Sequence, residues 1–120
     1  MKLSDGELRL MELFWETPQT LTAKEVSQLA AGRTGWSKNT TYTVLTKLVA
    51  KGALRREDPG FRCTPLVTRE DVQRTETSSL LQRLFGGSKQ ALLSTLLADE
   101  PLTAEDAAAL REMIDRRTGG

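Results

Sequence analysis

The chain has 120 residues, 38% of them hydrophobic and only 5% aromatic, so it suits one domain, or one small domain plus an appendage. Its formal net charge is +1, Cys63 is its only cysteine and it has no histidine. This composition excludes an internal disulfide framework, a Cys/His metal cluster and an imidazole base, so we expect no cofactor and no catalytic site.

The small aliphatic core leaves room for a partner subunit to complete it. A single cysteine fits a reducing compartment, and the sequence contains neither an apolar run of membrane-spanning length nor a signal-peptide pattern. We therefore expect a cytoplasmic protein that does not insert into a membrane.

The charge is concentrated in the middle third of the chain. Residues 1–32 carry three basic and five acidic groups, residues 33–65 carry seven and two, and residues 66–120 carry seven and nine. The net charges are therefore −2, +5 and −2. Such a pattern is expected when one face of a protein meets a polyanion, although a positive segment of this size can also be simply solvated.

A capping-box pattern predicts four helix starts, because a hydroxyl followed three residues later by a carboxylate can satisfy two free backbone N–H groups. These pairs are Ser4/Glu7, Thr22/Glu25, Thr68/Asp71 and Thr103/Asp106.

The first two helices are expected at Asp5–Trp15 and Ala23–Ala31, separated by a break at Thr17-Pro18-Gln19. Their predicted inward residues are Leu8, Met11, Leu13, Phe14 and Trp15 in the first, and Val26, Leu29 and Ala30 in the second. Trp36, just before the third helix, is expected to pack its start into the core rather than to stack on DNA.

The third helix is expected from the N-cap Ser37 to Lys51, with Gly52 as its C-terminal stop. Its apolar stripe comprises Thr41, Val44, Leu45, Leu48 and Val49, and its opposite face carries Asn39, Thr40, Tyr42, Thr43, Thr46 and Lys47. Threonine is a mediocre helix former, so four threonines in one helix would be explained if short hydroxyl and amide groups face base edges or phosphates. A merely solvated threonine-rich face is the alternative.

A β-hairpin is expected next, with extended segments at 53–57 and 61–65 around the Asp58-Pro59-Gly60 turn. On it, Arg55 (or Arg56) and Arg62 can point outward beside the third helix. Three helices followed by a hairpin predict a winged helix-turn-helix over residues 1–67, in which the third helix enters the major groove and the hairpin touches the phosphate backbone.

Three more helices are expected at Arg69–Phe85, Ser88–Leu97 and Ala104–Arg116, giving a mostly α protein with a helical region at 68–120. They carry many leucines and no aromatic layer, so a second copy of the segment is the expected partner, with folding back onto the first domain as the alternative. The predicted dimerisation residues are Leu80, Leu81, Leu84, Phe85, Leu92, Leu93, Leu96, Leu110, Met113 and Ile114.

These segments resemble the penicillinase-repressor family, BlaI/MecI with CopY as its copper-responding branch. The resemblance is carried by Leu13-Phe14-Trp15, Leu21 to Val26, Gly35 to Leu48, Lys51-Gly52-Ala53-Leu54, Leu84-Phe85-Gly86-Gly87-Ser88 and Ala109 to Ile114. It implies a homodimeric transcriptional repressor that binds a palindromic operator. Thr40, Thr43 and Lys47 match the DNA-contacting helix positions of the family, and Asn39 is a variant residue beside them.

In family members that control β-lactam resistance, a membrane sensor protease cuts the fifth helix and separates the DNA-binding part from the dimerisation part. The matching position is about Thr95-Leu96, where the Asn-Phe pair of the resistance repressors is absent. The copper branch ends in Cys-x-Cys motifs, which this chain lacks.

The DNA-binding residues predicted from the chain are Ser37, Lys38, Asn39, Thr40, Tyr42, Thr43, Thr46, Lys47, Arg55, Arg56 and Arg62. Two other functions stay open: a winged helix that docks an acidic protein, and a repressor that senses a small molecule between its dimer helices. Cys63 on the wing is expected to be inert rather than a redox switch.

Overall fold

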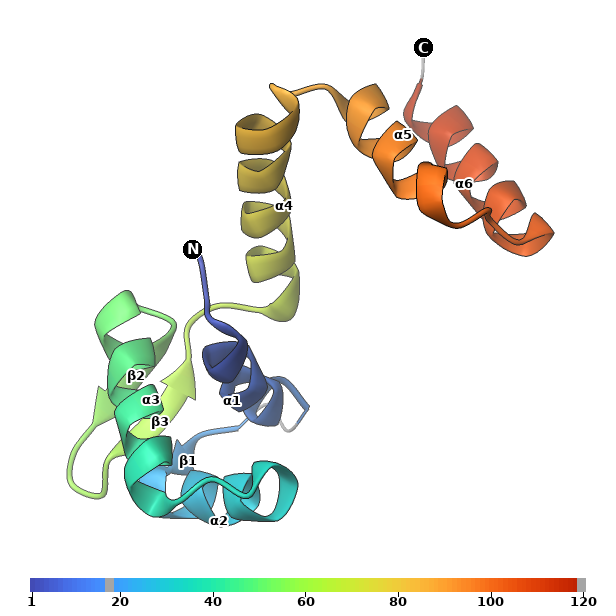
Figure 1. Cartoon of the computed structure of the whole chain (residues 1–120). Coiled ribbons are helices and arrows are strands. Elements are labelled where there is room, and N and C mark those ends of the chain that lie inside the picture. The colour runs from blue at the N-terminus through green and yellow to red at the C-terminus, as the bar shows by residue number, and fades with distance from the viewer. Residues whose placement is uncertain (17–18, 119–120) are drawn as a thin grey trace. The chain divides into compact units, whose positions relative to one another are not determined.

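The structure is a computed structural model that describes residues 1–16 and 19–118, and it divides into two compact units, 1–78 and 79–120 (Figure 1). The elements of the first unit are α1 (Asp5–Glu16), β1 (Leu21–Thr22), α2 (Ala23–Thr34), α3 (Lys38–Lys51), β2 (Leu54–Glu57), β3 (Arg62–Pro65) and the first part of α4 (Arg69–Phe85). The rest of α4, α5 (Lys89–Asp99) and α6 (Ala104–Arg117) form the second. The predicted break at Thr17-Pro18-Gln19 lies partly outside the described residues.

The expected winged helix is confirmed, and the structure adds one strand to it. The short β1 pairs antiparallel with β3, so the sheet has the order β1-β3-β2. Leu21 lies opposite Cys63 in one pair, and Leu54 lies opposite Pro65 in the other. The sequence predicted only the hairpin, because two residues next to a helix cap are too few to show a strand pattern.

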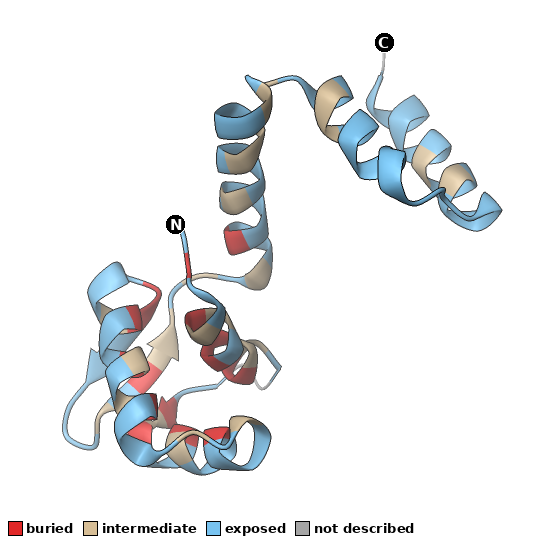
Figure 2. Ribbon diagram, in the orientation of Figure 1, coloured by how far each residue is buried: buried red, intermediate tan, exposed pale blue. Residues whose placement is uncertain are grey.

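The core of the first unit lies between the helices and one face of the sheet, and Figure 2 shows its buried residues in red. The largest fully buried side chains are Phe14, Leu10, Met11, Leu45, Leu48, Leu54, Val26, Thr41 and Cys63. Leu29 was expected to face inward, but its side chain is 41% exposed. Helical periodicity places it beside Val26 and Ala30, yet α2 buries only the narrow stripe that faces α1 and α3.

Three of the four predicted capping boxes form in both directions, and at the fourth the Thr103 hydroxyl accepts from the Asp106 N–H at 3.1 Å. Ser4 and Glu7 exchange backbone-to-side-chain bonds of 2.8 and 3.2 Å, and Thr22 forms the full capping box with Glu25. Thr68 and Asp71 do the same at 3.0 Å each, and these bonds lower the pKa of Asp71. Backbone N–H groups that a helix start would leave free are thus satisfied at the predicted positions.

The start of α3 is also fixed as expected. Ser37 caps the helix by accepting from the Thr40 N–H, and Trp36 is half-buried against the core. A Cβ atom at Gly6 would lie only 3.3 Å from Trp36 Cη2, so the absence of a side chain there lets the indole pack on α1. Trp36 therefore works as a structural anchor for the start of the helix.

The second unit has no comparable core. Within residues 79–118 no side chain is buried, whereas the helices α5 and α6 carry several large apolar groups that are 40–61% exposed. Apolar area of this extent on short helices is unusual for a stable monomeric segment. The described residues of the second unit therefore do not form a hydrophobic core by themselves.

One part-buried ion pair joins the start of α1 to the end of α3. Glu7 is 3% exposed, and its Oε1 accepts from Lys51 Nζ at 2.6 Å. Lys51 also donates to the Lys2 carbonyl at 3.0 Å. Burial alone would raise the pKa of Glu7, but the hydrogen bonds from Lys51 and Ser4 outweigh it and hold the pKa below its ordinary value.

We predict that Glu7→Gln lowers the free energy of unfolding at neutral pH by about 1–3 kcal/mol, because it removes the negative partner of Lys51. The depressed pKa of Glu7 means that its ion pair stabilises fully above the pKa of the unfolded chain and is lost as pH falls below about 4. The variant should therefore also lose part of its acid sensitivity in that range.

Urea denaturation at pH 7 and across pH 3–5 measures both effects. Glu25→Gln is the matched control, since Glu25 fills the same capping position on α2 but is exposed and forms no ion pair in the described structure. Equal losses for both variants would mean that the capping box, and not the pair with Lys51, accounts for the stability.

Candidate nucleic-acid interface

The helix α3 presents a polar face because its opposite face is buried. Thr41, Leu45 and Leu48 are fully buried, and Val44 and Val49 are half-buried, as the stripe predicted. The side chains left exposed by this packing are Lys38, Asn39, Thr40, Thr43, Thr46 and Lys47, together with the cap Ser37. None of these exposed groups is acidic, so the surface offers hydroxyl, amide and ammonium groups to a partner.

The hydroxyls of this surface are partly committed to the helix itself. Thr43 Oγ1 donates to the Asn39 carbonyl and Thr46 Oγ1 to the Tyr42 carbonyl, each at 2.9 Å. A threonine bonded in this way keeps its lone pairs as acceptors. The threonine-rich face can thus accept from amino groups of bases while contributing methyl groups to apolar contacts.

Tyr42 differs from the expectation that it lies on the open face. Its side chain is half-buried, and its ring meets Phe61 edge to face with centroids 5.7 Å apart. The Arg56 guanidinium lies over the Phe61 ring, 3.6 Å from its centroid. Lys38 Nζ is 5.5 Å from the centroid of Tyr42, so four side chains link α3 to the hairpin.

Phe61 joins the hairpin to α3 and α2, a position that was not expected from the sequence. It has φ +48°, and its carbonyl accepts from the Ala23 N–H at 2.9 Å, which ties the hairpin to the start of α2. An aromatic residue placed directly after Pro59-Gly60 was the available signal, because a turn seldom carries a large apolar group without a packing partner. Tyr42 and Phe61 therefore position the wing beside α3.

The structure separates the wing arginines onto two faces of the sheet. Leu54, Arg56 and Cys63 share the face toward the helices, since residues two apart alternate and Arg56 lies opposite Cys63. Arg55 and Arg62 lie on the other face. Of the two arginines expected as alternatives beside α3, Arg56 lies on the α3 side, whereas Arg55 and Arg62 lie on the face turned away from the helices. All three side chains are exposed.

The predicted cations also differ in how they are paired. Arg55 binds Glu57 at 3.1 Å, and Arg56 binds Asp58 at 3.3 Å. Within the described ranges, Lys38, Lys47 and Arg62 form no ion pair. These three are therefore available to an external anion without first breaking an ion pair.

Cys63 is fully buried under the sheet, and burial raises the pKa of its thiol to about 11, with Arg56 opposing and Asp58 adding to the shift. The group is therefore a neutral thiol near pH 7, a form that is a poor nucleophile and a poor metal ligand. The described residues also contain no cluster of three or more potential metal ligands.

The predicted dimerisation residues all belong to the second unit. Leu84, Leu93, Leu96, Met113 and Ile114 are exposed, and Leu80, Leu81, Phe85, Leu92 and Leu110 are half-buried. Thr95 and Leu96, the position matching the family's cleavage site, are both exposed within the helix α5. None of these residues is buried within the single chain.

Comparison with known proteins agrees with this geometry. Residues 3–116 match the family model described as penicillinase repressor. The penicillinase repressor of Bacillus licheniformis is 28% identical over 116 residues, which cover 95% of this chain and 90% of that protein.

Two solved structures resemble the winged helix. One is the solution structure of the DNA-binding domain of the repressor BlaI, with a TM-score of 0.53 and 32% identity over 58% of this chain and 87% of that one. The other is monomeric Bacillus licheniformis BlaI in complex with the blaP half-operator, with a TM-score of 0.50 and 32% identity over 59% and 88% of the two chains. The fold, the exposed α3 surface and the match over nearly the whole length lead to one conclusion: this chain belongs to the penicillinase-repressor family.

Proposed function

We propose that this protein is a homodimeric transcriptional repressor that binds a palindromic operator through α3 and the wing. The observation that carries the proposal is the acid-free exposed surface of α3, with its free Lys38 and Lys47. The similarity to a BlaI chain bound to half of an operator supports the same reading. An α-helix of this kind fits the major groove, where base edges are distinguishable.

The roles within the interface follow from side-chain chemistry. Asn39, Thr40 and Thr43 are short polar groups near the start of α3, so they would read base edges. Lys38, Lys47 and Arg62 would contact phosphates and supply affinity that depends on salt. Arg55 and Arg56 would contribute less, because each is already paired with an acid on the hairpin.

The dimer is needed because one module of this size makes few specific contacts. Two copies related by a two-fold axis double those contacts, and the operator repeat mirrors the axis. The exposed leucines of α5 and the apolar residues of α6 support association through the second unit, since no residue among 79–118 is buried in the single chain. The partner is thus proposed to be a second copy of the same segment.

Release follows from the same coupling. Losing the second unit, by proteolysis near Thr95-Leu96 or by unfolding, would leave two separate winged helices whose affinity falls with the lost avidity. Both residues lie inside the helix α5, so a membrane sensor protease would have to unwind that helix before cutting. A repressor acting on DNA would work in the cytoplasm, which is the location that we propose. Among the described helices, none combines the length and the apolar character needed to span a bilayer.

A protein-docking winged helix is the second candidate function, favoured by the same positive surface around α3.

The first test is a selection of the purified full-length protein against random duplex DNA at about physiological salt. We expect an inverted repeat whose half-sites lie roughly one helical turn apart. A selection that enriches no sequence would contradict the repressor function and direct attention to an acidic protein partner.

Thr43→Ala should weaken binding to the selected repeat more than binding to unrelated DNA. A lost contact of about 1 kcal/mol in each half-site amounts to about 2 kcal/mol for the dimer, or roughly 30-fold in Kd. Thr75→Ala is the control, because Thr75 forms the same bond to the carbonyl four residues earlier, but on α4. Equal effects of the two variants would assign the loss to the helix and not to base reading.

Arg62→Ala should weaken specific and unrelated DNA about equally and should reduce the salt slope of the dimer by about 2, one for each protomer. Titrations of both DNAs at several salt concentrations measure this. Arg74→Ala, which also removes one exposed arginine but from α4, controls for the change in net charge. An unchanged slope for Arg62→Ala would remove Arg62 from the interface.

Leu96→Glu should convert a dimer to a monomer at micromolar concentration, because it places two carboxylates in an apolar interface. Leu66→Glu is the matched control, since Leu66 is 50% exposed but belongs to the first unit. Sedimentation measures the mass, and circular dichroism confirms retained helix content. Dimers that persist in the folded Leu96→Glu variant would contradict this interface.

A further inference from the structure

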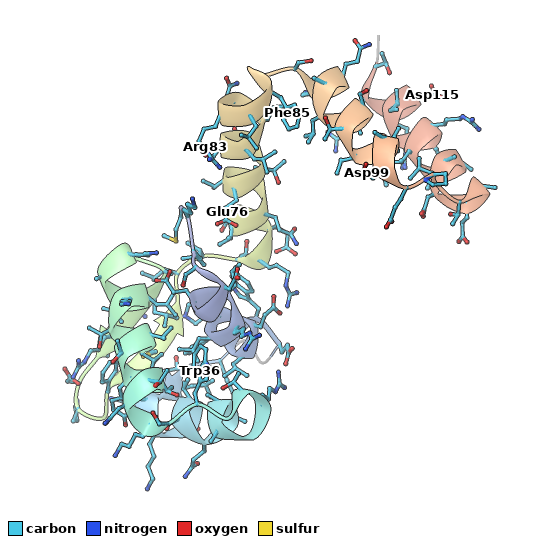
Figure 3. All side chains as sticks on the ribbon, viewed as in Figure 1. Trp36, Glu76, Arg83, Phe85, Asp99 and Asp115 are labelled. Carbon is cyan, nitrogen blue, oxygen red and sulfur yellow. The ribbon has the colours of Figure 1, made fainter. Side chains whose placement is uncertain are left out.

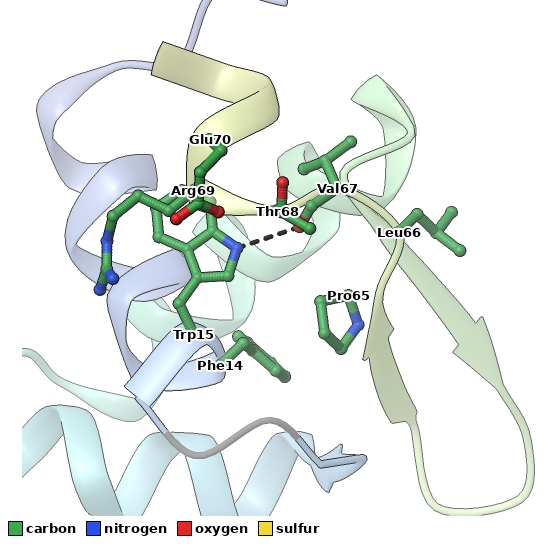
Figure 4. Close-up of a pocket in the computed structure, with 8 residues that line it drawn as sticks. All are labelled: Phe14, Trp15, Pro65, Leu66, Val67, Thr68, Arg69 and Glu70. Carbon is green, nitrogen blue, oxygen red and sulfur yellow. Dashed lines mark hydrogen bonds between the residues drawn. The ribbon is translucent and has the colours of Figure 1, made fainter. Parts of the chain in front are cut away.

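Three contacts hold the base of α4 against the rest of the winged helix. Arg69 grips the Glu12 carboxylate of α1 with two N–H groups, one of them at 3.2 Å. Trp15 Nε1 donates to the Val67 carbonyl at 3.0 Å (Figure 4). The Leu3 N–H donates to Glu76 Oε1 at 3.0 Å, and Figure 3 labels Glu76 on α4. The α4 clasp is made of Leu3, Glu12, Trp15, Val67, Arg69 and Glu76.

The clasp surrounds a single buried residue of α4. Val72 is 3% exposed and is the one core residue among the described positions of this helix. The Arg69 guanidinium lies 5.5 Å from the ring centroid of Trp15. A pocket of about 340 Å³ is lined by Phe14, Trp15 and residues 65–70 (Figure 4). One small apolar contact cannot fix the direction of a helix, so the polar contacts must do so.

The clasp is also linked to α3. The Lys2 carbonyl accepts from Lys51 at the end of α3, and the next N–H, from Leu3, donates to Glu76. The Lys2 carbonyl and the Leu3 N–H belong to the same peptide group. The end of the DNA-facing helix and the base of α4 are therefore held by the same short N-terminal segment.

The geometry of α4 explains why its base matters. The helix is continuous over 17 residues, with residues 69–78 in the first unit and 79–85 in the second. A helix of this length is about 25 Å long. Because this one helix belongs to both units, the contacts at its base are the ones through which the first unit holds it.

We propose that the α4 clasp is a positioning device that sets which spacing of operator half-sites the dimer accepts; this rests on the dimeric repressor function proposed above. Two linked DNA-binding modules reach their highest effective concentration when the connection matches the distance between sites. A firmly held α4 favours one spacing strongly. A loosened α4 accepts several spacings and binds the best one less tightly.

The Glu12–Arg69 ion pair of the clasp lies at the edge of the winged helix, although the clasp residue Leu3 belongs to the core. The Glu12 and Arg69 side chains are 40% and 39% exposed. The core residues of α1 and α3, in contrast, are buried. Removing the clasp should therefore leave the α3 surface intact. This separates a positioning role from a general role in stability.

Binding of the full-length protein to the selected inverted repeat tests the proposal, together with a single half-site and repeats whose spacer is one base pair longer or shorter. For Arg69→Ala and Glu76→Ala we expect half-site Kd to stay within about twofold of wild type. Binding to the selected repeat should weaken by about 3- to 10-fold, and the preference over the altered spacers should shrink. Glu76→Gln keeps an acceptor for the Leu3 N–H and should behave like wild type.

Arg74→Ala is the charge-matched control for Arg69→Ala, because it removes an arginine from the same helix outside the clasp. A spacing preference that stays unchanged in Arg69→Ala and Glu76→Ala would overturn the positioning role, as would half-site binding that falls in parallel with the full repeat. Amide hydrogen exchange gives a second measure, with faster exchange expected in residues 69–78 of both variants. If the wild-type protein selects no inverted repeat, the proposed function itself fails. If the wild type selects a repeat and both variants share its spacing preference, only the positioning role fails.

Discussion

The burial of Thr41, Leu45 and Leu48 against α1 and α2 is the constraint on which the rest of the protein depends. These side chains are fully buried, and together they fix the rotation of α3 about its own axis. Once that rotation is fixed, Asn39, Thr43 and Lys47 must face outward. The surface that would meet DNA is thus a consequence of core packing, and it needs no dedicated interaction to hold it open.

The hairpin is positioned relative to α3 by aromatic and charged contacts more than by apolar burial. Phe61 contacts both Tyr42 and Arg56, and its carbonyl also accepts from the N–H at the start of α2. Internal pairing with Glu57 and Asp58 then leaves Arg62 as the wing cation without an ion pair in the described structure. The positive charge of the middle third is consequently less uniform than the sequence implies, because two of its three wing arginines already have acidic neighbours.

The two units handle hydrophobic surface in opposite ways. The first buries a compact aliphatic core around Phe14, while the second leaves its leucines partly or largely exposed. Two short helices with few aromatic residues form a single layer, and one layer cannot exclude water from both sides of a core. A second copy, as proposed above, would supply the missing layer.

The sequence alone determined the helix boundaries to within about three residues, the capping boxes and the exposed face of α3, because these depend on local hydrogen bonds and on a 3.6-residue period. It also predicted the hairpin, since proline and glycine mark the turn. Only the tertiary structure decided that β1 joins the sheet, that Leu29 stays exposed, that Tyr42 supports the wing and that Arg56 lies on the α3 side. The same holds for the contacts of Glu76 and Arg69. Each of these depends on residues far apart in the chain, whose pairing and facing are set by packing geometry and leave no periodic signal in the sequence.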